Sequence, residues 1–235
     1  TAYIQKQLWS ESILDDVQIL HSPEFVISYT VEEIEQVNWN EEWEKNFEAI
    51  NVDGICHVRA PFHPKTDAQF DIVIEPKMSF GTGHHATTYL MIEQMSGLDM
   101  TGKQVIDFGT GTGVLAILAE RMGASTIIAI DNDEWSIENT RENIIRNNCD
   151  KIQLIKADTV PSGHPADIML ANINLNIIVA SINAIKNACK PGATILFSGI
   201  MLHDEPQIRA CLDSNSIKIE ECRYRDNWLI IRAKV

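Results

Sequence analysis

Basic residues are scarce in this sequence, and the scarcity excludes one class of partner. The 235 residues contain 19 Lys and Arg against 33 Asp and Glu, a formal net charge of −14 at pH 7. Phosphate groups are bound by basic faces, so we expect no direct binding to nucleic acid. Residues 1–55 hold two basic and twelve acidic side chains, a net of −10, which leaves −4 for residues 56–235. This acidic segment fits a basic protein partner, although a solvated helical face gives the same composition.

Paired cysteines and long apolar runs are also missing. We expect reduced thiols in the cytoplasm and no metal site, because no Cys-x-x-Cys spacing occurs among the five cysteines Cys56, Cys149, Cys189, Cys211 and Cys222. No apolar run approaches the roughly 20 residues that span a bilayer, and no charged-then-apolar leader is visible. We therefore expect neither a membrane protein nor a secreted one. With 45% hydrophobic residues, the chain is globular and can build one large domain with a small appendage.

One stretch has the pattern of a buried strand, a glycine-rich turn and the start of a helix. It precedes the apolar residues 114–119 and reads Val105-Ile106-Asp107-Phe108-Gly109-Thr110-Gly111-Thr112-Gly113. Glycine permits a positive φ and lets the main chain come within contact distance of a ligand. The helix that follows directs its free N–H groups at whatever binds there. The pattern therefore predicts a ligand site at the turn.

A carboxylate follows the next strand. The apolar run 126–130 ends at Asp131, and an acid in this place commonly accepts hydrogen bonds from ribose hydroxyls. The dinucleotide fingerprint Gly-x-Gly-x-x-Gly is not met, because Val114 stands at its third glycine, and Asp107 would disfavour a pyrophosphate. A sulfonium is positively charged and tolerates nearby acids. The turn and its two acids resemble the S-adenosylmethionine (SAM) site of Rossmann-like methyltransferases.

Strand and helix patterns alternate along the rest of the chain. Strands are predicted at 152–155, 167–171 and 193–197, and helices at 134–148, 177–190 (stopped by Pro191-Gly192) and 206–212. Two last strands, 217–222 and 228–232, are expected to pair antiparallel. This order predicts a doubly wound α/β sheet, in which ligands bind at the carboxyl ends of the strands. Gly109, Asp131 and Asn172 all fall at such ends.

We predict two domains, with a boundary at Asp53-Gly54. Residues 1–53 form a small α+β substrate-recognition segment and linker, and residues 54–235 form the methyltransferase domain. In the first, a helix is expected over 7–20, a strand over 25–29, and a helix whose apolar stripe is Trp43, Phe47 and Ile50. In the second, strands at 55–60 and 70–74 flank a proline-containing loop and are expected to form a hairpin.

A second loop of small residues precedes a helix over 89–95. It reads Glu75-Pro76-Lys77-Met78-Ser79-Phe80-Gly81-Thr82-Gly83-His84-His85-Ala86-Thr87-Thr88. Thr87 or Thr88 can cap the helix. A histidine pair is more often structural than catalytic. This loop lies just upstream of the cofactor strand and can fold over the cofactor, so His84 and His85 are candidates for a proton relay.

Several segments together resemble the bacterial methyltransferase family of ribosomal protein L11, a protein of the large subunit. They are Phe80 to Thr88, Val105 to Gly113, Ala171-Asn172-Ile173, Ser198-Gly199-Ile200 and Trp43-Glu44-Lys45-Asn46-Phe47. The resemblance covers nearly the whole chain, and the Phe-Gly-Thr-Gly-His-His loop is its most selective part. It implies SAM-dependent methylation of lysine side chains and the N-terminal amine of that basic protein, within a class I methyltransferase fold.

The resemblance also carries over site residues and a role for the N-terminal part. By position, the family's cofactor contacts fall on Thr88, Gly109, Asp131 and Asn172, to which we add the neighbouring Thr87, Asp107 and Gly111. In the family an N-terminal domain grips the substrate. Residues 1–53 are shorter than that module and are expected to begin inside it. Ala86 stands where the family often has proline or glutamate, with little expected effect. We expect a monomer.

The nucleophile is the difficult part of the implied reaction. A lysine of pKa about 10.4 is neutral roughly one time in a thousand near pH 7.4, a cost of roughly 4 kcal/mol. An apolar pocket and the sulfonium charge both favour the neutral amine, so a dedicated base is optional. We expect residues 81–85 and Asn172 to shape the acceptor pocket, with Asn172 or main-chain carbonyls orienting the amine.

Other functions fit parts of the same pattern. Enzymes that methylate nucleobases follow the equivalent of Asn172 with Pro-Pro and an aromatic residue that stacks a flipped base, whereas Ile173-Asn174-Leu175 follow here. A methyltransferase of RNA, DNA or another small amine is the alternative enzyme. A non-catalytic SAM-binding module of the ribosome is a different class of alternative. A dinucleotide oxidoreductase is the least favoured.

Overall fold

The structure is a computed structural model that describes residues 4–17, 20, 24, 26–32, 49–75 and 86–235. The chain divides into two compact units, residues 1–46 and 47–235. Among the described residues, none of the helices has the length and apolar composition that a bilayer crossing needs.

The N-terminal unit differs from its predicted secondary structure. Its described part contains two 3-10 helices, η1 (Lys6–Leu8) and η2 (Glu11–Asp16), so the continuous helix predicted over 7–20 is wrong. The acidic Asp15 near the end of η2 opposes the helix dipole, and Val17 has an extended conformation. The strand predicted over 25–29 is also wrong at residues 26–29, where Val26 is fully exposed and has no strand partner among the described residues. The helix predicted around Trp43 lies outside the described residues.

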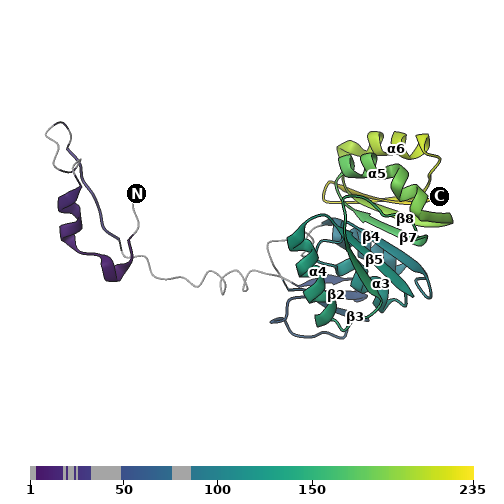
Figure 1. The fold of residues 1–235 in the computed structure, drawn as a ribbon, viewed down its shortest axis with the longest axis horizontal. Coiled ribbons are helices and arrows are strands. Elements are labelled where there is room, and N and C mark those ends of the chain that lie inside the picture. Colours follow the sequence, from purple (N-terminus) through teal and green to yellow (C-terminus); the bar gives the residue numbers. More distant parts are fainter. Residues whose placement is uncertain (1–3, 18–19, 21–23, 25, 33–48, 76–85) are drawn as a thin grey trace. The chain divides into compact units, whose positions relative to one another are not determined.

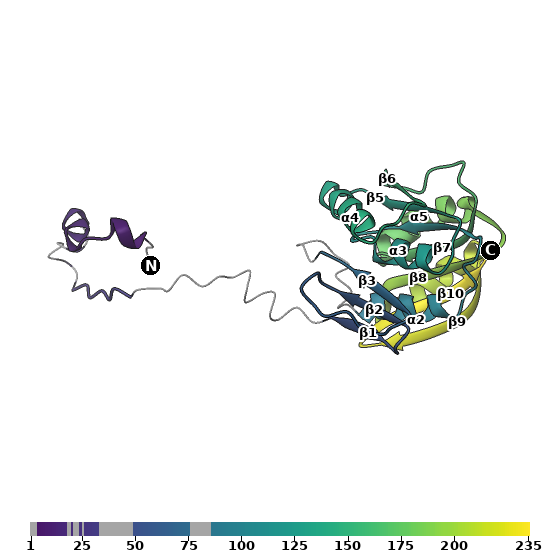
Figure 2. The same ribbon diagram turned by 90° about the horizontal axis from the view of Figure 1, so that it is seen from below.

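The second unit is built on a seven-stranded sheet, as Figure 2 shows from β6 at one edge to β9 at the other. In spatial order the strands are β6 (Ile152–Lys156), β5 (Thr126–Asp131), β4 (Gln104–Phe108), β7 (Ala166–Asn172), β8 (Cys189–Met201), β10 (Trp228–Lys234) and β9 (Lys218–Arg225). The first five are parallel, and β10 pairs antiparallel with β8 and with β9. The predicted doubly wound sheet with an antiparallel last pair is confirmed.

Helices cover both faces of this sheet. They are α2 (Ala86–Ser96), α3 (Val114–Arg121), α4 (Glu134–Arg146), α5 (Leu175–Ala188) and α6 (Glu205–Ser214), with a short η4 (Leu202–Asp204) before α6. Successive strand residues point to opposite faces, so Val105 joins the core under α2 and α3, and Ile106 joins the core under α5 and α6. Buried on both faces, the parallel strands have nearly continuous apolar runs. Figure 1 shows α5 and α6 on one side and α3 on the other.

A three-stranded sheet lies on the α3 side and shares its core. Its strands are β1 (Ile50–Val52), β2 (Cys56–Arg59) and β3 (Phe70–Val73), in that order. The predicted hairpin of residues 55–60 and 70–74 is wrong, because β2 and β3 are parallel and the antiparallel partner of β2 is β1. The connection of residues 60–69 is long enough to return along a four-residue strand. Arg59 secures the parallel register with two hydrogen bonds to the Asp71 carboxylate, of 2.8 and 3.0 Å.

The α5–β8 junction also departs from the prediction. Helix α5 ends at Ala188, and Pro191-Gly192 lies inside β8 and does not stop the helix. The pairing of β8 with β7 shifts register between Ala166 and Ile168, opposite this segment, and Gly192 has φ +79°. Such an irregularity at the beginning of a strand accommodates proline, which has no N–H to donate.

Helix α4 fastens the small sheet to the large one through buried asparagines. Asn147 forms a strand-like pair with the main chain of Val73, accepting from its N–H at 2.9 Å and donating to its C=O at 2.7 Å. One turn earlier, Asn143 accepts from the Glu75 N–H at 2.9 Å and donates to the Thr112 C=O at 2.9 Å. These amides satisfy the edge of β3, which no further strand covers among the described residues.

Removal of the Asn147 amide should therefore destabilise the second unit. Asn147→Ala leaves the part-buried N–H and C=O of Val73 without their partners, which costs about 1–3 kcal/mol for each group. We expect the free energy of unfolding to fall by roughly 2–4 kcal/mol in urea denaturation. Arg141→Ala, which breaks an exposed ion pair with Glu138 on the same helix, is the control and should change it by less than about 0.5 kcal/mol. Equal effects of the two substitutions would contradict this role.

Candidate functional site

The candidate site begins at the glycine turn between β4 and α3. Gly109, Gly111 and Gly113 have φ values of +78°, +57° and +83°, which residues with a side chain rarely adopt. The N–H groups of Gly109 and Thr110 both donate to the Ile130 carbonyl, at 2.8 and 2.9 Å. The turn is thus fastened to the end of β5, next to Asp131.

At two of these glycines, protein atoms fill the space that a side chain would occupy. A Cβ at Gly109 would lie 2.1 Å from Cγ2 of Ile173, and one at Gly113 would lie 2.9 Å from Cγ2 of Thr140. The sequence pattern explains the missing side chains by the approach of a ligand. The structure adds a second reason, because Ile173, which follows β7, and Thr140 of α4 pack directly against the turn.

Asp131 lies at the end of β5 and faces the turn. Its Oδ2 accepts from the Gly111 N–H at 2.9 Å, and its Oδ1 accepts from the Asp133 N–H at 3.1 Å. A carboxylate has about four acceptor positions, so two remain for hydroxyl donors. The main chain therefore fixes the orientation of this carboxylate before any ligand binds.

Asp107 is the second acid of the site and is completely buried. Its Oδ2 accepts from the Thr110 hydroxyl at 2.7 Å, whereas its Oδ1 has no hydrogen-bond partner among the described residues. Burial raises the pKa of Asp107 to about 7, and the charge of Asp131 adds to the rise, while hydrogen bonds from Thr110 and Ala116 partly offset it. Two acids in one low-dielectric place favour a cationic ligand and disfavour a pyrophosphate.

The end of β7 supplies the other side of the site. Asn172 pairs with Ser198 of β8, and among the residues that the structure describes none is hydrogen-bonded to its amide. Asn174 caps α5, its Oδ1 accepting from the Ile177 N–H at 3.1 Å. Asn172 is half-buried and available, whereas Asn174 already has a structural role.

The threonines predicted as helix caps lie inside the helix. Thr87 and Thr88 occupy the second and third positions of α2, so the prediction that one of them is the N-cap is wrong. Both are buried, with 4% and 1% of their surface exposed. His84 and His85 lie outside the described residues.

Helix α4 was predicted from the sequence, but its support of the glycine turn was not. Thr140 donates to the Gly111 carbonyl at 2.7 Å, and Asn143 holds the Thr112 carbonyl. The spacing of Asn139, Asn143 and Asn147 could have indicated this support. Asparagine is unfavourable inside a helix, so a row of asparagines at every fourth position suggests that their side chains bind groups outside the helix. The role of Ile173 had no comparable signal, because its contact with Gly109 joins strands that are distant in sequence.

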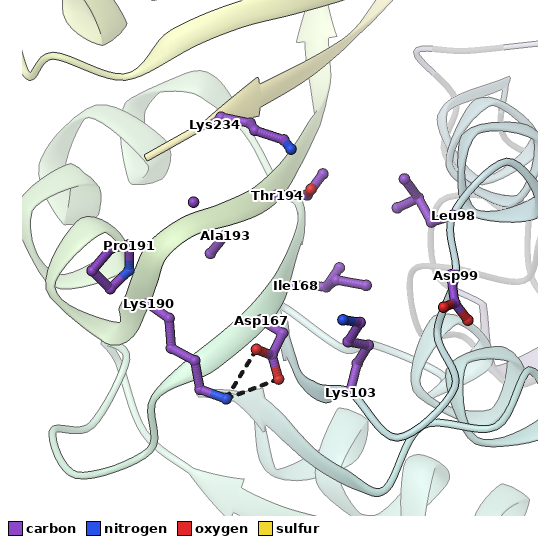
Figure 3. A pocket seen from close by; sticks show the side chains of 11 residues that line it. Leu98, Asp99, Lys103, Asp167, Ile168, Lys190, Pro191, Ala193, Thr194 and Lys234 are labelled. Carbon is purple, nitrogen blue, oxygen red and sulfur yellow. Dashed lines mark hydrogen bonds and ion pairs between the residues drawn. The ribbon is translucent and has the colours of Figure 1, made fainter.

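A separate cavity of about 280 Å³ lies at the amino-terminal edge of the parallel strands (Figure 3). Its lining includes Lys103, Asp167 and Lys190, and Lys190 donates to both oxygens of Asp167 at 2.9 Å. The cavity lies where strands β4 and β7 begin. Asp131 and Asn172 lie at the opposite edge, where strands β5 and β7 end. The lining of the cavity contains neither the glycine turn nor the strand-end acids, so we do not assign the site to this cavity.

Known proteins resemble this sequence along most of its length. A model of the ribosomal protein L11 methyltransferase family matches residues 1–235. The ribosomal protein L11 methyltransferase of Porphyromonas gingivalis is 41% identical over 89% of this chain and 74% of its own length. That of Phocaeicola vulgatus is 39% identical over 98% of this chain and 84% of its own length.

Solved structures agree with the sequence matches. The ribosomal protein L11 methylase of Lactobacillus delbrueckii subsp. bulgaricus superposes with a TM-score of 0.72 at 26% identity, over 79% of this chain and 97% of that one. A SAM-dependent methyltransferase from Aquifex aeolicus, at 15% identity and a TM-score of 0.55 over 62% of this chain and 89% of that one, shares the fold. From its glycine turn, its two acids and these matches along the whole sequence, the chain belongs to the ribosomal protein L11 methyltransferase family.

Proposed function

We propose that this protein transfers methyl groups from SAM to lysine side chains and the N-terminal amine of ribosomal protein L11. One observation supports the cofactor most directly: the Asp131 carboxylate is held by the Gly111 N–H beside a buried second acid. The relatives from P. gingivalis and P. vulgatus, which are named for the same substrate, support the acceptor.

The residues present fit a cationic adenosine cofactor. Asp131 would accept from the ribose hydroxyls, because its orientation is already fixed by two main-chain N–H groups. The Oδ1 of buried Asp107, which has no partner among the described residues, adds negative charge suited to a cation. Bound SAM supplies an electrophilic methyl group on a sulfonium. Further contacts are proposed at Thr87, Thr88, Gly109, Gly111 and Asn172.

The protein's part in the reaction is alignment and desolvation of the amine. Asn172 has a half-buried amide with no partner among the described residues, so its oxygen can accept from the incoming amine and aim the nitrogen lone pair. The apolar surface of Ile173 follows it in sequence and favours the neutral form of a lysine. We propose His84 or His85 as the proton relay, and unchanged turnover after alanine substitution of both would exclude this role.

Residues 1–53 are proposed to recognise the substrate. Their charge is −10, from two basic and twelve acidic residues, which complements a basic ribosomal protein. Association driven by this charge should weaken with salt, because the Debye length falls from about 10 Å at 0.1 M to about 3 Å at 1 M ionic strength.

A labelling assay tests the proposed reaction. The protein is incubated with methyl-labelled SAM and either purified L11 or ribosomal RNA, and product masses locate the methyl groups. We expect label in L11, on lysines and the N-terminus. Label in RNA would support a nucleic-acid methyltransferase, and SAM binding without any label would support a non-catalytic module; either result would overturn the proposal.

Asp131→Ala should weaken SAM binding. Hydrogen bonds to a charged acceptor contribute about 1.5–3 kcal/mol, so calorimetry should show a rise in Kd of roughly 10- to 100-fold. Glu138→Ala, at an exposed position of α4, is the control and should leave Kd unchanged. Undiminished affinity of Asp131→Ala would remove the proposed ribose contact.

Asp107→Asn should lower the affinity for the cofactor and raise the stability of the protein at alkaline pH. The pKa of Asp107 is about 7 in the folded protein, above the ordinary 3.8, so the folded state binds the proton more tightly. This acid's contribution to stability is greatest below about pH 4 and is lost as the pH rises through about 7. Relative to wild type, the asparagine variant should gain stability between pH 5 and pH 8, by about 3 kcal/mol at most.

Thermal unfolding at several pH values measures that gain. Asp150→Asn, at an exposed position, should show no such pH-dependent difference from wild type. SAM should bind Asp107→Asn more weakly, since one negative charge is lost beside the cation. A constant stability difference across this pH range would contradict a raised pKa at Asp107.

A further inference from the structure

Gly199 of β8 lies against the main chain that follows Asn172. A Cβ at Gly199 would lie 2.5 Å from the Ile173 carbonyl oxygen, 2.8 Å from its carbonyl carbon and 3.0 Å from its nitrogen. All three atoms belong to the main chain, so no side-chain rotation can relieve the clash. Gly199 also has φ +78°, which disfavours any other residue.

On its other side, Ile173 is held by the glycine turn between β4 and α3. Its Cγ2 occupies the space of a Cβ at Gly109, which would be 2.1 Å away. The residue is thus fixed between two glycines, by its side chain at Gly109 and by its main chain at Gly199. This arrangement joins the end of β7 to the glycine turn after β4 and to β8.

The position of Asn172 depends on this arrangement. Asn172 and Ile173 share a planar peptide unit, so a displacement of the Ile173 main chain also moves the main chain of Asn172. A Cβ at Gly199 would push the Ile173 carbonyl group away by about 1 Å and would crowd the Ile173 nitrogen, which belongs to the peptide unit shared with Asn172. A displacement of about 1 Å is enough for misaligned groups to lose about 100-fold in rate.

We propose that Gly199 is a positioning residue for methyl transfer, which keeps the Ile173 peptide, and through it the Asn172 amide, in place for the acceptor amine. This inference rests on the proposed function. Gly199 acts through Asn172 and need not contact either substrate. Its effect should therefore disappear when the Asn172 amide is absent.

The chain provides a matched control on the same strand. Gly192 also has a positive φ, +79°, but a Cβ there has no atom within 4 Å. Gly192→Ala therefore carries the same main-chain strain as Gly199→Ala without the collision. We expect kcat on L11 to fall roughly 10- to 100-fold in Gly199→Ala and less than about 3-fold in Gly192→Ala.

A double-mutant cycle separates positioning from a general structural effect. In the Asn172→Ala background, Gly199→Ala should lower kcat/KM by less than about 3-fold, because residues acting as a unit are not additive. Multiplication of the two single effects would overturn the proposal. If Gly199→Ala does not fold, Ile173→Ala, which removes the contact at Gly109, enters the same cycle with the same expectation.

A crystal structure of Gly199→Ala tests the geometry without any assay. The main chain of residues 172–174 should shift by about 1 Å relative to Gly192→Ala, while β8 stays in place. A shift of β8 with residues 172–174 unmoved would refute the positioning role even if L11 is methylated. Failure of wild type to methylate L11 would instead refute the proposed function, and the crystal structure would still decide the role of Gly199.

Discussion

The parallel pairing of β4 with β5 is the constraint on which the site depends. It puts Phe108 beside Ile130, so that the first two N–H groups of the glycine turn donate to the Ile130 carbonyl. The turn is therefore held beside the end of β5. Asp131 is the residue after Ile130, and its carboxylate accepts a hydrogen bond from the Gly111 N–H. Because ligands bind where parallel strands end, this one register creates the cradle and supplies its acid.

The buried acid Asp107 is electrostatically unfavourable in an otherwise well-packed domain. Asp107 is fully buried with one oxygen unpaired among the described residues, and its pKa is raised to about 7. An apolar residue of the same shape would favour folding, since buried charge is stabilised only by partners. A cationic cofactor would supply the missing charge, so affinity for the ligand and stability of the empty protein oppose each other at this residue. Such opposition is common where function requires an unfavourable arrangement.

Rigid support for the site comes from elements that contribute no proposed contact. Helix α4 holds the carbonyls of the glycine turn through Thr140 and Asn143, and the same Asn143 binds the main chain of Glu75 beyond β3. Strand β8 supports the end of β7 through Gly199. The groups proposed for cofactor and acceptor are therefore supported by two elements, α4 at the glycine turn and β8 at the end of β7, which keeps their mutual geometry fixed.

The order of strands and helices in residues 104–235, the glycine turn and the acids at the strand ends could be predicted from the sequence, because apolar periodicity and turn residues act locally. The prediction failed where partners are distant: β2 and β3 are parallel rather than a hairpin, and Pro191-Gly192 lies in a strand rather than ending a helix. Two features follow from the fold alone: Gly109 and Gly199 hold Ile173 between them, and Thr140 and Asn143 of α4 hold the turn. These contacts join residues that are tens of positions apart, and no local pattern encodes which side chain will fill the space that a glycine leaves.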